Sequence, residues 1–169
     1  MIRGRILLTG DGLEQFADGR RNRRTAIGNE NPSARLHVES FLETKERHKE
    51  RELDFKGVND SEFRLILRQA LHNVLDFSAV LAYCPAGSSQ LFRLRRYNGK
   101  SHEHTNQIEK QTFYDFHIHM ATERYQNSGL REDAFATPTN RYADFHGGLD
   151  CLLSDCSFEI PTNSTLPLF

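Results

Sequence analysis

The histidines of this chain gather in one stretch, and four of them form two closely spaced pairs. Five of the eight histidines lie between residues 102 and 146, and the two H-x-H pairs are His102/His104 and His117/His119. Residues at i and i+2 of a β-strand point to the same side of the sheet. A pair that lies in a strand therefore presents two imidazole rings on one face, where the rings can transfer protons near neutral pH or bind a metal ion.

The segment 112–120, TFYDFHIHM, predicts a strand with one apolar and one polar face. The apolar face carries Tyr114, Phe116, Ile118 and Met120, and the polar face carries Phe113, Asp115, His117 and His119. The apolar face should meet the core of the domain. The two imidazoles and the carboxylate should then project together from the opposite side of the sheet.

The segment 90–97, QLFRLRRY, predicts a second strand with a cationic face. Strict alternation groups Arg96 with the apolar Phe92 and Leu94, and it places Arg93, Arg95 and Tyr97 on the other side. If the two predicted strands are neighbours, this second group shares a surface with His117 and His119. The loop that carries His102 and His104 would cover the edge of that surface, giving a concave site.

Such a site suits phosphodiester chemistry. Histidine acts as acid or base, and arginine binds phosphate and stabilises charge on its oxygens. In RNA the 2′-OH is an internal nucleophile, so we predict a metal-independent ribonuclease site that needs no cofactor. Its predicted catalytic residues are His117, His119, Tyr97, His102 and His104, and its predicted phosphate-binding residues are Arg93, Arg95, Arg96 and Asn98. The alternative is a solvent-exposed sheet face on which histidine and arginine have no catalytic function.

The histidine pairs also allow a metal site. Two H-x-H pairs offer four imidazoles to one divalent transition-metal ion. The segment HIHMATE has the H-x-H-x3-E spacing of the first cupin metal motif, but it lacks a glycine six residues before His117, and the second motif is absent. The alternative metal ligands are therefore His102, His104, His117, His119 and Glu123.

The remaining patterns predict a single α+β domain, a mostly antiparallel sheet with helices packed on one face. We expect strands at 3–8, 35–42, 78–84, 90–97 and 112–120, and helices at 61–75, 121–128 and 141–156. The charged segment 43–54 predicts a solvated helix or hairpin. The expected division is an N-terminal region 1–57 with an arginine-rich loop at 17–33, a core 58–160 and a tail 161–169.

Composition narrows the class of protein. Of the 169 residues 37% are hydrophobic and 27% are charged, and 12 Phe and 5 Tyr provide large aromatic side chains for a core. No apolar run approaches the roughly 18 residues of a membrane-spanning helix, and the N-terminal apolar stretch is too short for a secretory signal. Three cysteines are too few for a disulfide framework. We expect a cytoplasmic protein that does not contact a membrane.

Four short motifs between Asp76 and Glu123 carry a resemblance to a known family. In order they are D-F-S-x-x-L-x-Y, L-R-R-Y-N-G, H-E-H-T-N and F-H-I-H. This stretch resembles the TumE-type toxins of bacterial toxin–antitoxin systems and related small bacterial and phage proteins. In those proteins an Arg-Tyr-Asp-Asn strand end precedes a histidine pair and a proline-led histidine cluster. Here Gly99 follows Asn98 directly, no proline precedes the last histidine pair, and the region between the motifs is longer.

The resemblance implies a toxin that acts on RNA and is silenced by an antitoxin partner. A non-enzymatic alternative is a protein-binding module of a phage or defence system. That alternative relies on Arg20–Arg24, on the charged segment 43–54 and on the acidic C-terminal third. Residues 1–110 carry a net charge of +4, and residues 111–169 carry −5.

Overall fold

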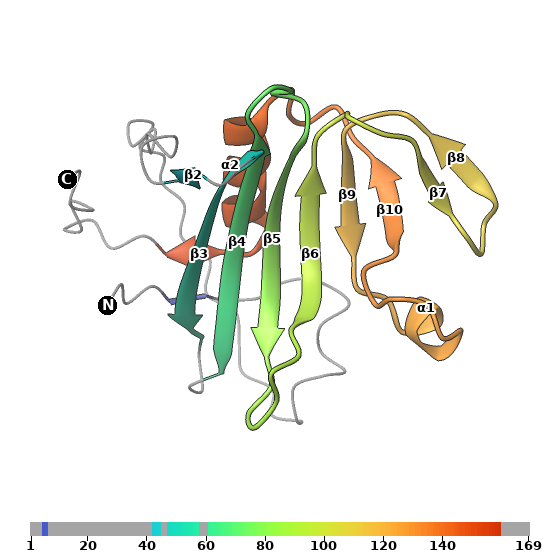
Figure 1. Ribbon diagram of the computed structural model, residues 1–169. Helices are drawn as coiled ribbons and strands as arrows, with labels where there is room; N and C mark the ends of the chain where they lie inside the picture. The colour runs from blue at the N-terminus through green and yellow to red at the C-terminus, as the bar shows by residue number, and fades with distance from the viewer. Residues whose placement is uncertain (1–4, 7–41, 45–46, 58–60, 160–169) are drawn as a thin grey trace, which may run out of the picture.

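The chain folds around one antiparallel β-sheet (Figure 1). The computed structural model describes residues 5–6, 42–44, 47–57 and 61–159. Within these residues seven strands form a sheet in the order β10-β9-β6-β5-β4-β3-β2, and all neighbours are antiparallel. The strands are β2 (Glu43–Thr44), β3 (His48–Lys56), β4 (Glu62–Ala70), β5 (Phe77–Cys84), β6 (Phe92–Asn98), β9 (His117–Met120) and β10 (Phe135–Pro138). The prediction of a mostly antiparallel sheet is confirmed.

Two short ribbons and two helices complete the described residues. β7 (His104–Asn106) pairs with β8 (Gln111–Phe113), and β1 (Arg5–Ile6) pairs with β11 (Phe158–Glu159). The helix α2 (Phe145–Asp155) packs against β5 and β6. The helix α1 (Glu123–Asn127) follows β9 and lies beyond the end of that strand (Figure 1). The expectation that the helices together cover one face of the sheet is therefore not confirmed.

The predicted helix 61–75 is wrong, because most of this segment is strand β4. Phe63, Leu65 and Leu67 are buried at alternate positions, as in a strand that covers a core with one face. A spacing of four residues fits both a helix and a strand, so Phe63 and Leu67 satisfy either pattern. Pairing with the neighbouring strand β3 favours the strand over the helix, and Arg64 on β4 forms ion pairs with Glu52 and Asp54 on β3.

The other predicted elements agree with the structure to different degrees. The segments 78–84 and 90–97 form the antiparallel pair β5 and β6, and 112–120 is divided into β8 and β9. The segment 43–54 falls in a hairpin rather than a helix, since most of it belongs to β3, which pairs with β4. The predicted helix 121–128 becomes α1, and the predicted helix 141–156 becomes α2. Of the predicted strand 35–42 the structure describes only Leu42, which is not in a strand, and the loop 17–33 and the tail 161–169 lie outside the described residues.

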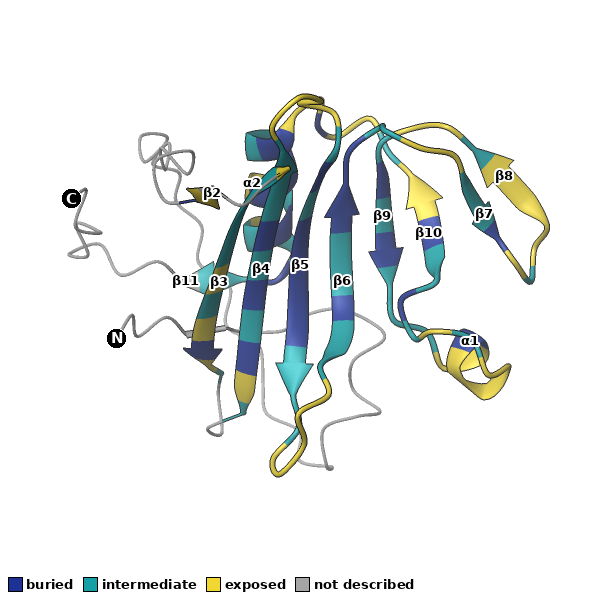
Figure 2. Cartoon of the chain, viewed as in Figure 1, coloured by how far each residue is buried: buried dark blue, intermediate teal, exposed yellow. Residues whose placement is uncertain are grey.

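The core lies between the sheet and α2. Its most buried side chains come from both layers: Leu65, Ala79, Leu81, Tyr97, Phe145, Leu152 and Cys156. The long dark stretch of β5 marks this buried centre of the sheet (Figure 2). Asp144 starts α2, because its side chain accepts a hydrogen bond from the Gly147 N–H at 2.8 Å. The helix therefore begins four residues later than predicted.

Hydrogen bonds among Tyr97, Arg141 and Asp155 hold the end of α2 against the sheet. We expect them to make the stability of the protein depend on pH. Asp155 accepts a 2.6 Å hydrogen bond from the Tyr97 hydroxyl and two 2.7 Å bonds from Arg141. The Arg141 bonds, supported by Tyr97, lower the pKa of the Asp155 carboxyl in the folded state, against the opposing effect of burial. This stabilisation is therefore fully present above about pH 4 and is lost as the pH falls through the folded pKa.

We expect Asp155→Asn to destabilise the protein by about 1 kcal/mol at pH 7, because Arg141 is half exposed and water screens the pair. Urea unfolding of both proteins at several pH values from 7 to 3 measures the difference. The difference should shrink toward the acid end of this range. A difference that stays constant would show that the carboxylate charge contributes nothing.

Candidate functional site

A β-bulge decides which side chains of β6 face the histidine strand β9. Leu81 on β5 lies opposite Arg95 and Ala82 lies opposite Arg93, so Leu94 is an extra residue on β6. After Leu94, each side chain of β6 lies on the face opposite to the one that strict alternation from Phe92 would give it. Arg96 lies opposite His119 and Asn98 opposite His117 on β9.

The predicted grouping of Arg93, Arg95 and Tyr97 with the histidines is therefore wrong for two of the three. Tyr97 is fully buried on the α2 side, where its hydroxyl donates to Asp155. Arg95 is on the same side, where its charge acts on Asp155 and Cys156. Arg93 precedes the bulge, and its charge acts on Arg96. Arg96 and Asn98 take the places beside the histidines that strict alternation had given to Arg95 and Tyr97.

His117 and His119 lie side by side in β9 with almost no exposure to solvent. Their exposed fractions are 0% and 2%, and their ring centroids are 4.9 Å apart. Nδ1 of His117 lies 2.7 Å from the carbonyl oxygen of Asp115, and Nδ1 of His119 lies 2.8 Å from that of Asp133. A carbonyl oxygen only accepts, so Nδ1–H is the donor in both rings. In the neutral imidazole the Nε2 atom of each ring then carries a free lone pair.

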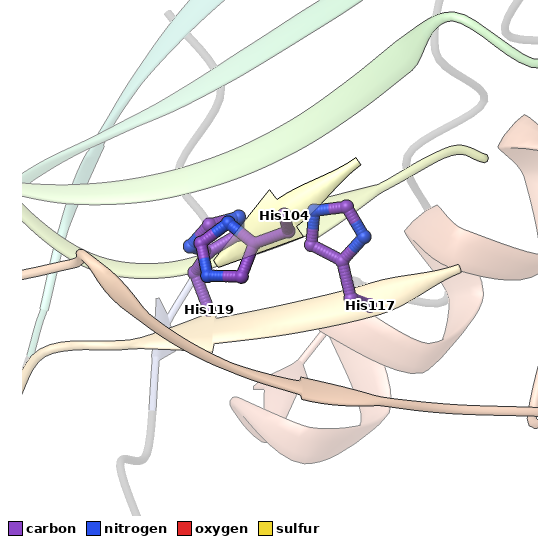
Figure 3. A group of neighbouring side chains, drawn as sticks. All are labelled: His104, His117 and His119. Carbon is purple, nitrogen blue, oxygen red and sulfur yellow. The ribbon is translucent and has the colours of Figure 1, made fainter. Parts of the chain in front are cut away.

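The hairpin of β7 and β8 adds a third imidazole to this pair. The His104 ring lies 5.3 Å from the His117 ring and 4.8 Å from the His119 ring, measured between centroids. One ring nitrogen from each of the three residues lies within 4.8 Å of the others. Figure 3 shows the three rings gathered together, two from β9 and one from β7. We call these residues, His104, His117 and His119, the histidine triad.

Asn106 holds the hairpin in place against the edge strand β10. Its side chain donates to the carbonyl oxygen of Ala136 at 2.8 Å and accepts from the Ala136 N–H at 2.9 Å. This amide thus pairs with β10 as a neighbouring strand would. The same Oδ1 atom accepts a hydrogen bond from Nε2 of His104 at 3.0 Å. Asn106 therefore connects the position of His104 directly to the sheet.

Burial keeps the triad neutral. Burial lowers the pKa of His117 to about 4. Burial, together with the nearby charge of Arg96, lowers the pKa of His119 to about 2. The pKa of His104 is also lowered by burial, against the opposing hydrogen bond to Asn106. Neutral imidazole can act as a base or bind a metal, whereas a general acid at neutral pH requires the protonated form.

An arginine and a buried carboxylate lie beside the triad. Nη2 of Arg96 is 3.2 Å from both ring nitrogens of His119. A group in the plane of the ring at these distances would overlap the Cε1 atom. The guanidinium therefore lies over the face of the ring. Nε of Arg96 forms an ion pair with Oδ2 of the fully buried Asp133 at 3.3 Å. Oδ1 of the same carboxylate accepts a hydrogen bond from Arg131 at 2.8 Å. Burial lowers the pKa of Arg96, and Asp133 opposes this shift. No pattern in the sequence pointed to Asp133, and Asn106 entered the sequence analysis only as the last residue of the motif H-E-H-T-N.

The remaining predicted residues take other positions. His102 is exposed, and its ring lies 5.7 Å from that of His117, measured between centroids. Glu123 is exposed at the start of α1, where it accepts from Asn127, and it is not part of the metal-ligand group found among the described residues. The Asp115 side chain, predicted on the histidine face, instead binds Lys100 at 3.1 Å.

Comparisons with family models, with curated proteins and with solved structures found no match to this chain. In the part of the chain that the structure describes, no helix is long and apolar enough to cross a membrane.

Proposed function

We propose that the protein is a metalloprotein whose histidine triad binds one divalent transition-metal ion at a hydrolytic site. The observation that carries this proposal is the convergence of three imidazoles: His104 is half-buried, and His117 and His119 are buried and donate Nδ1–H to main-chain carbonyl oxygens. Metal-binding histidines are typically fixed in this way, because the hydrogen bond orients the ring and leaves the other nitrogen as the ligand. Buried neutral imidazole is also the form that binds a metal.

The spacing of the triad requires only a small adjustment to bind an ion. Nitrogens that share one zinc ion at 2.0–2.1 Å lie about 3.3 Å apart. The three candidate nitrogens lie within 4.8 Å of one another, so modest ring rotations bring them to that spacing. His104 belongs to a short hairpin, and the other two belong to the central sheet.

The surroundings of the triad favour an anionic substrate. Three histidine ligands leave a position for water, whose pKa a bound zinc ion lowers to near 7, and this supplies hydroxide for hydrolysis. Arg96 lies at the triad with a partly exposed side chain and can bind a phosphate oxygen. We therefore propose a phosphodiester as the substrate class. The resemblance to TumE-type toxins extends this proposal to RNA as substrate and an antitoxin as partner.

Metal content tests the proposal directly. Protein purified without a histidine tag should hold about one equivalent of a divalent transition metal, measured by elemental analysis. The double variant His117→Ala/His119→Ala should hold less than about a tenth of an equivalent, because it loses two of three ligands. His72→Ala removes an exposed histidine and should match the wild type. A wild-type protein that stays below about a tenth of an equivalent, even after incubation with zinc and gel filtration, would overturn the metal centre.

A metal-independent ribonuclease remains the second candidate. Arg96 and Asn98 flank the histidine pair on one face, and His102 adds an exposed imidazole beside His117. RNA cleavage in excess chelator would support this candidate if His102→Ala and His117→Ala both abolish it. Cleavage that chelator stops and zinc restores would support the metal centre instead. The protein-binding alternative relies partly on Arg20–Arg24, which lie outside the described residues.

A further inference from the structure

We infer that the side-chain oxygen of Asn98 is the fourth ligand of the metal centre, which makes it a site of three nitrogens and one oxygen. The inference rests on the metal centre proposed above and assigns to Asn98 a role different from the predicted phosphate contact. It is carried by the juxtaposition of a buried amide with the Nε2 atoms of His117 and His119.

The fold holds Asn98 at the triad. Asn98 lies in β6 directly opposite His117 in β9, and only 5% of it is exposed. The hydroxyl of Tyr142 donates to the main-chain oxygens of both residues, at 3.0 Å to Asn98 and 2.9 Å to His117. The Tyr142 hydroxyl therefore ties the backbones of the two strands together at this point.

The amide of Asn98 faces two lone pairs. Its Nδ2 atom lies 3.3 Å from Nε2 of His117 and 3.4 Å from Nε2 of His119. Both Nε2 atoms are acceptors, because the Nδ1–H groups of these rings are already used by main-chain carbonyls. Without a metal, the two N–H bonds of one amide satisfy both rings. A cation at the same place satisfies both rings as well.

The oxygen of the same amide lacks a partner. Oδ1 of Asn98 is buried and accepts no hydrogen bond from the described residues. A half turn of the amide brings this oxygen to the histidine side, where it would face two lone pairs. Three acceptors that converge in a buried space repel one another unless a cation lies between them. A metal ion at this place would give the Asn98 oxygen the partner that it lacks and would replace the amide N–H groups at both imidazoles.

This ligand set has a consequence for reactivity. Imidazole suits zinc, copper, iron and nickel, whereas a neutral carbonyl oxygen suits harder ions and is the weaker ligand for zinc. Asn98 is therefore the ligand that gives way to water or substrate, while the triad keeps the ion in place.

Cobalt binding to the full chain tests the inference, with visible absorption as the readout. Asn98→Leu removes the oxygen at similar volume and should weaken cobalt binding about tenfold or more. Asn98→Asp supplies a charged oxygen and should tighten it by about tenfold. At saturating cobalt both variants should change the absorption spectrum, because the oxygen ligand has changed. Asn140→Asp adds the same charge at an exposed position and should leave affinity and spectrum unchanged.

The outcomes separate the two proposals. If Asn98 only competes with the metal through its N–H groups, Asn98→Leu would bind cobalt as tightly as the wild type or more tightly, with the wild-type spectrum. That result overturns the Asn98 ligand and leaves the triad intact. A wild type that binds no cobalt overturns both proposals. Near-ultraviolet circular dichroism of each variant confirms that loss of binding does not reflect loss of folding.

Discussion

Zinc at about a hundredfold excess over its Kd is expected to stabilise the wild-type protein by about 2.7 kcal/mol. The ion would bind the folded triad, whose members come from the sheet and from the β7–β8 hairpin, and the unfolded chain does not hold them together. His119→Ala should abolish this increment, because two remaining imidazoles bind one ion far more weakly. Thermal unfolding with and without zinc measures the increment in each protein.

The experiment compares the stabilisation by zinc in each protein, because His119→Ala itself lowers the free energy of unfolding. His119 is buried, so His119→Ala creates a cavity and lowers stability even without metal. His72→Ala should keep the full zinc increment, since His72 is exposed and outside the triad. An equal increment in wild type and His119→Ala would place zinc at a different site. No increment in any of the proteins would contradict the metal centre.

Gly99→Ala is expected to destabilise the protein by about 3 kcal/mol or more. A Cβ atom at this position would overlap the carbonyl oxygen of Leu75 and lie 2.8 Å from Cδ1 of Phe77. Neither group can move freely: the Leu75 oxygen is backbone, and the Phe77 ring is buried in the core. The Gly99 N–H also donates to the Phe77 carbonyl at 3.0 Å, which holds the two segments together.

Gly87→Ala is the matched control for this prediction. Gly87 has a φ of +74°, and a Cβ atom there would meet nothing within 4 Å. Its substitution costs only the backbone strain of a left-handed residue, about 1 kcal/mol. Urea unfolding of both variants beside the wild type measures the two losses. Equal losses would show that the approach of Gly99 to Leu75 imposes no packing constraint.

The Gly99 contact also explains a detail of the sequence near the site. Gly99 follows Asn98 at the end of β6, where the chain passes close to the β4–β5 turn. Only a residue without a side chain fits this passage. The glycine therefore preserves the position of Asn98, which immediately precedes it and faces the triad.

The sequence by itself determined the local pattern of several elements. Alternation in 112–120 correctly placed Phe116 and Ile118 toward the core and His117 and His119 on the opposite face, because side-chain direction in a strand has a strict period of two. The strands expected at 78–84 and 90–97 formed β5 and β6, which pair antiparallel. These features depend on neighbours in the chain, and local spacing therefore predicts them.

Tertiary structure decided which residues form the site. The extra residue at Leu94 reversed the faces of β6 and brought Arg96 and Asn98, rather than Arg95 and Tyr97, to the histidines. Pairing with β3 made β4 a strand, although its apolar spacing also fits a helix. His104 joined the triad through Asn106 and β10, which is thirty residues away along the chain. Bulges, strand partners and long-range hydrogen bonds depend on contacts between distant segments, and a local sequence pattern therefore does not predict them.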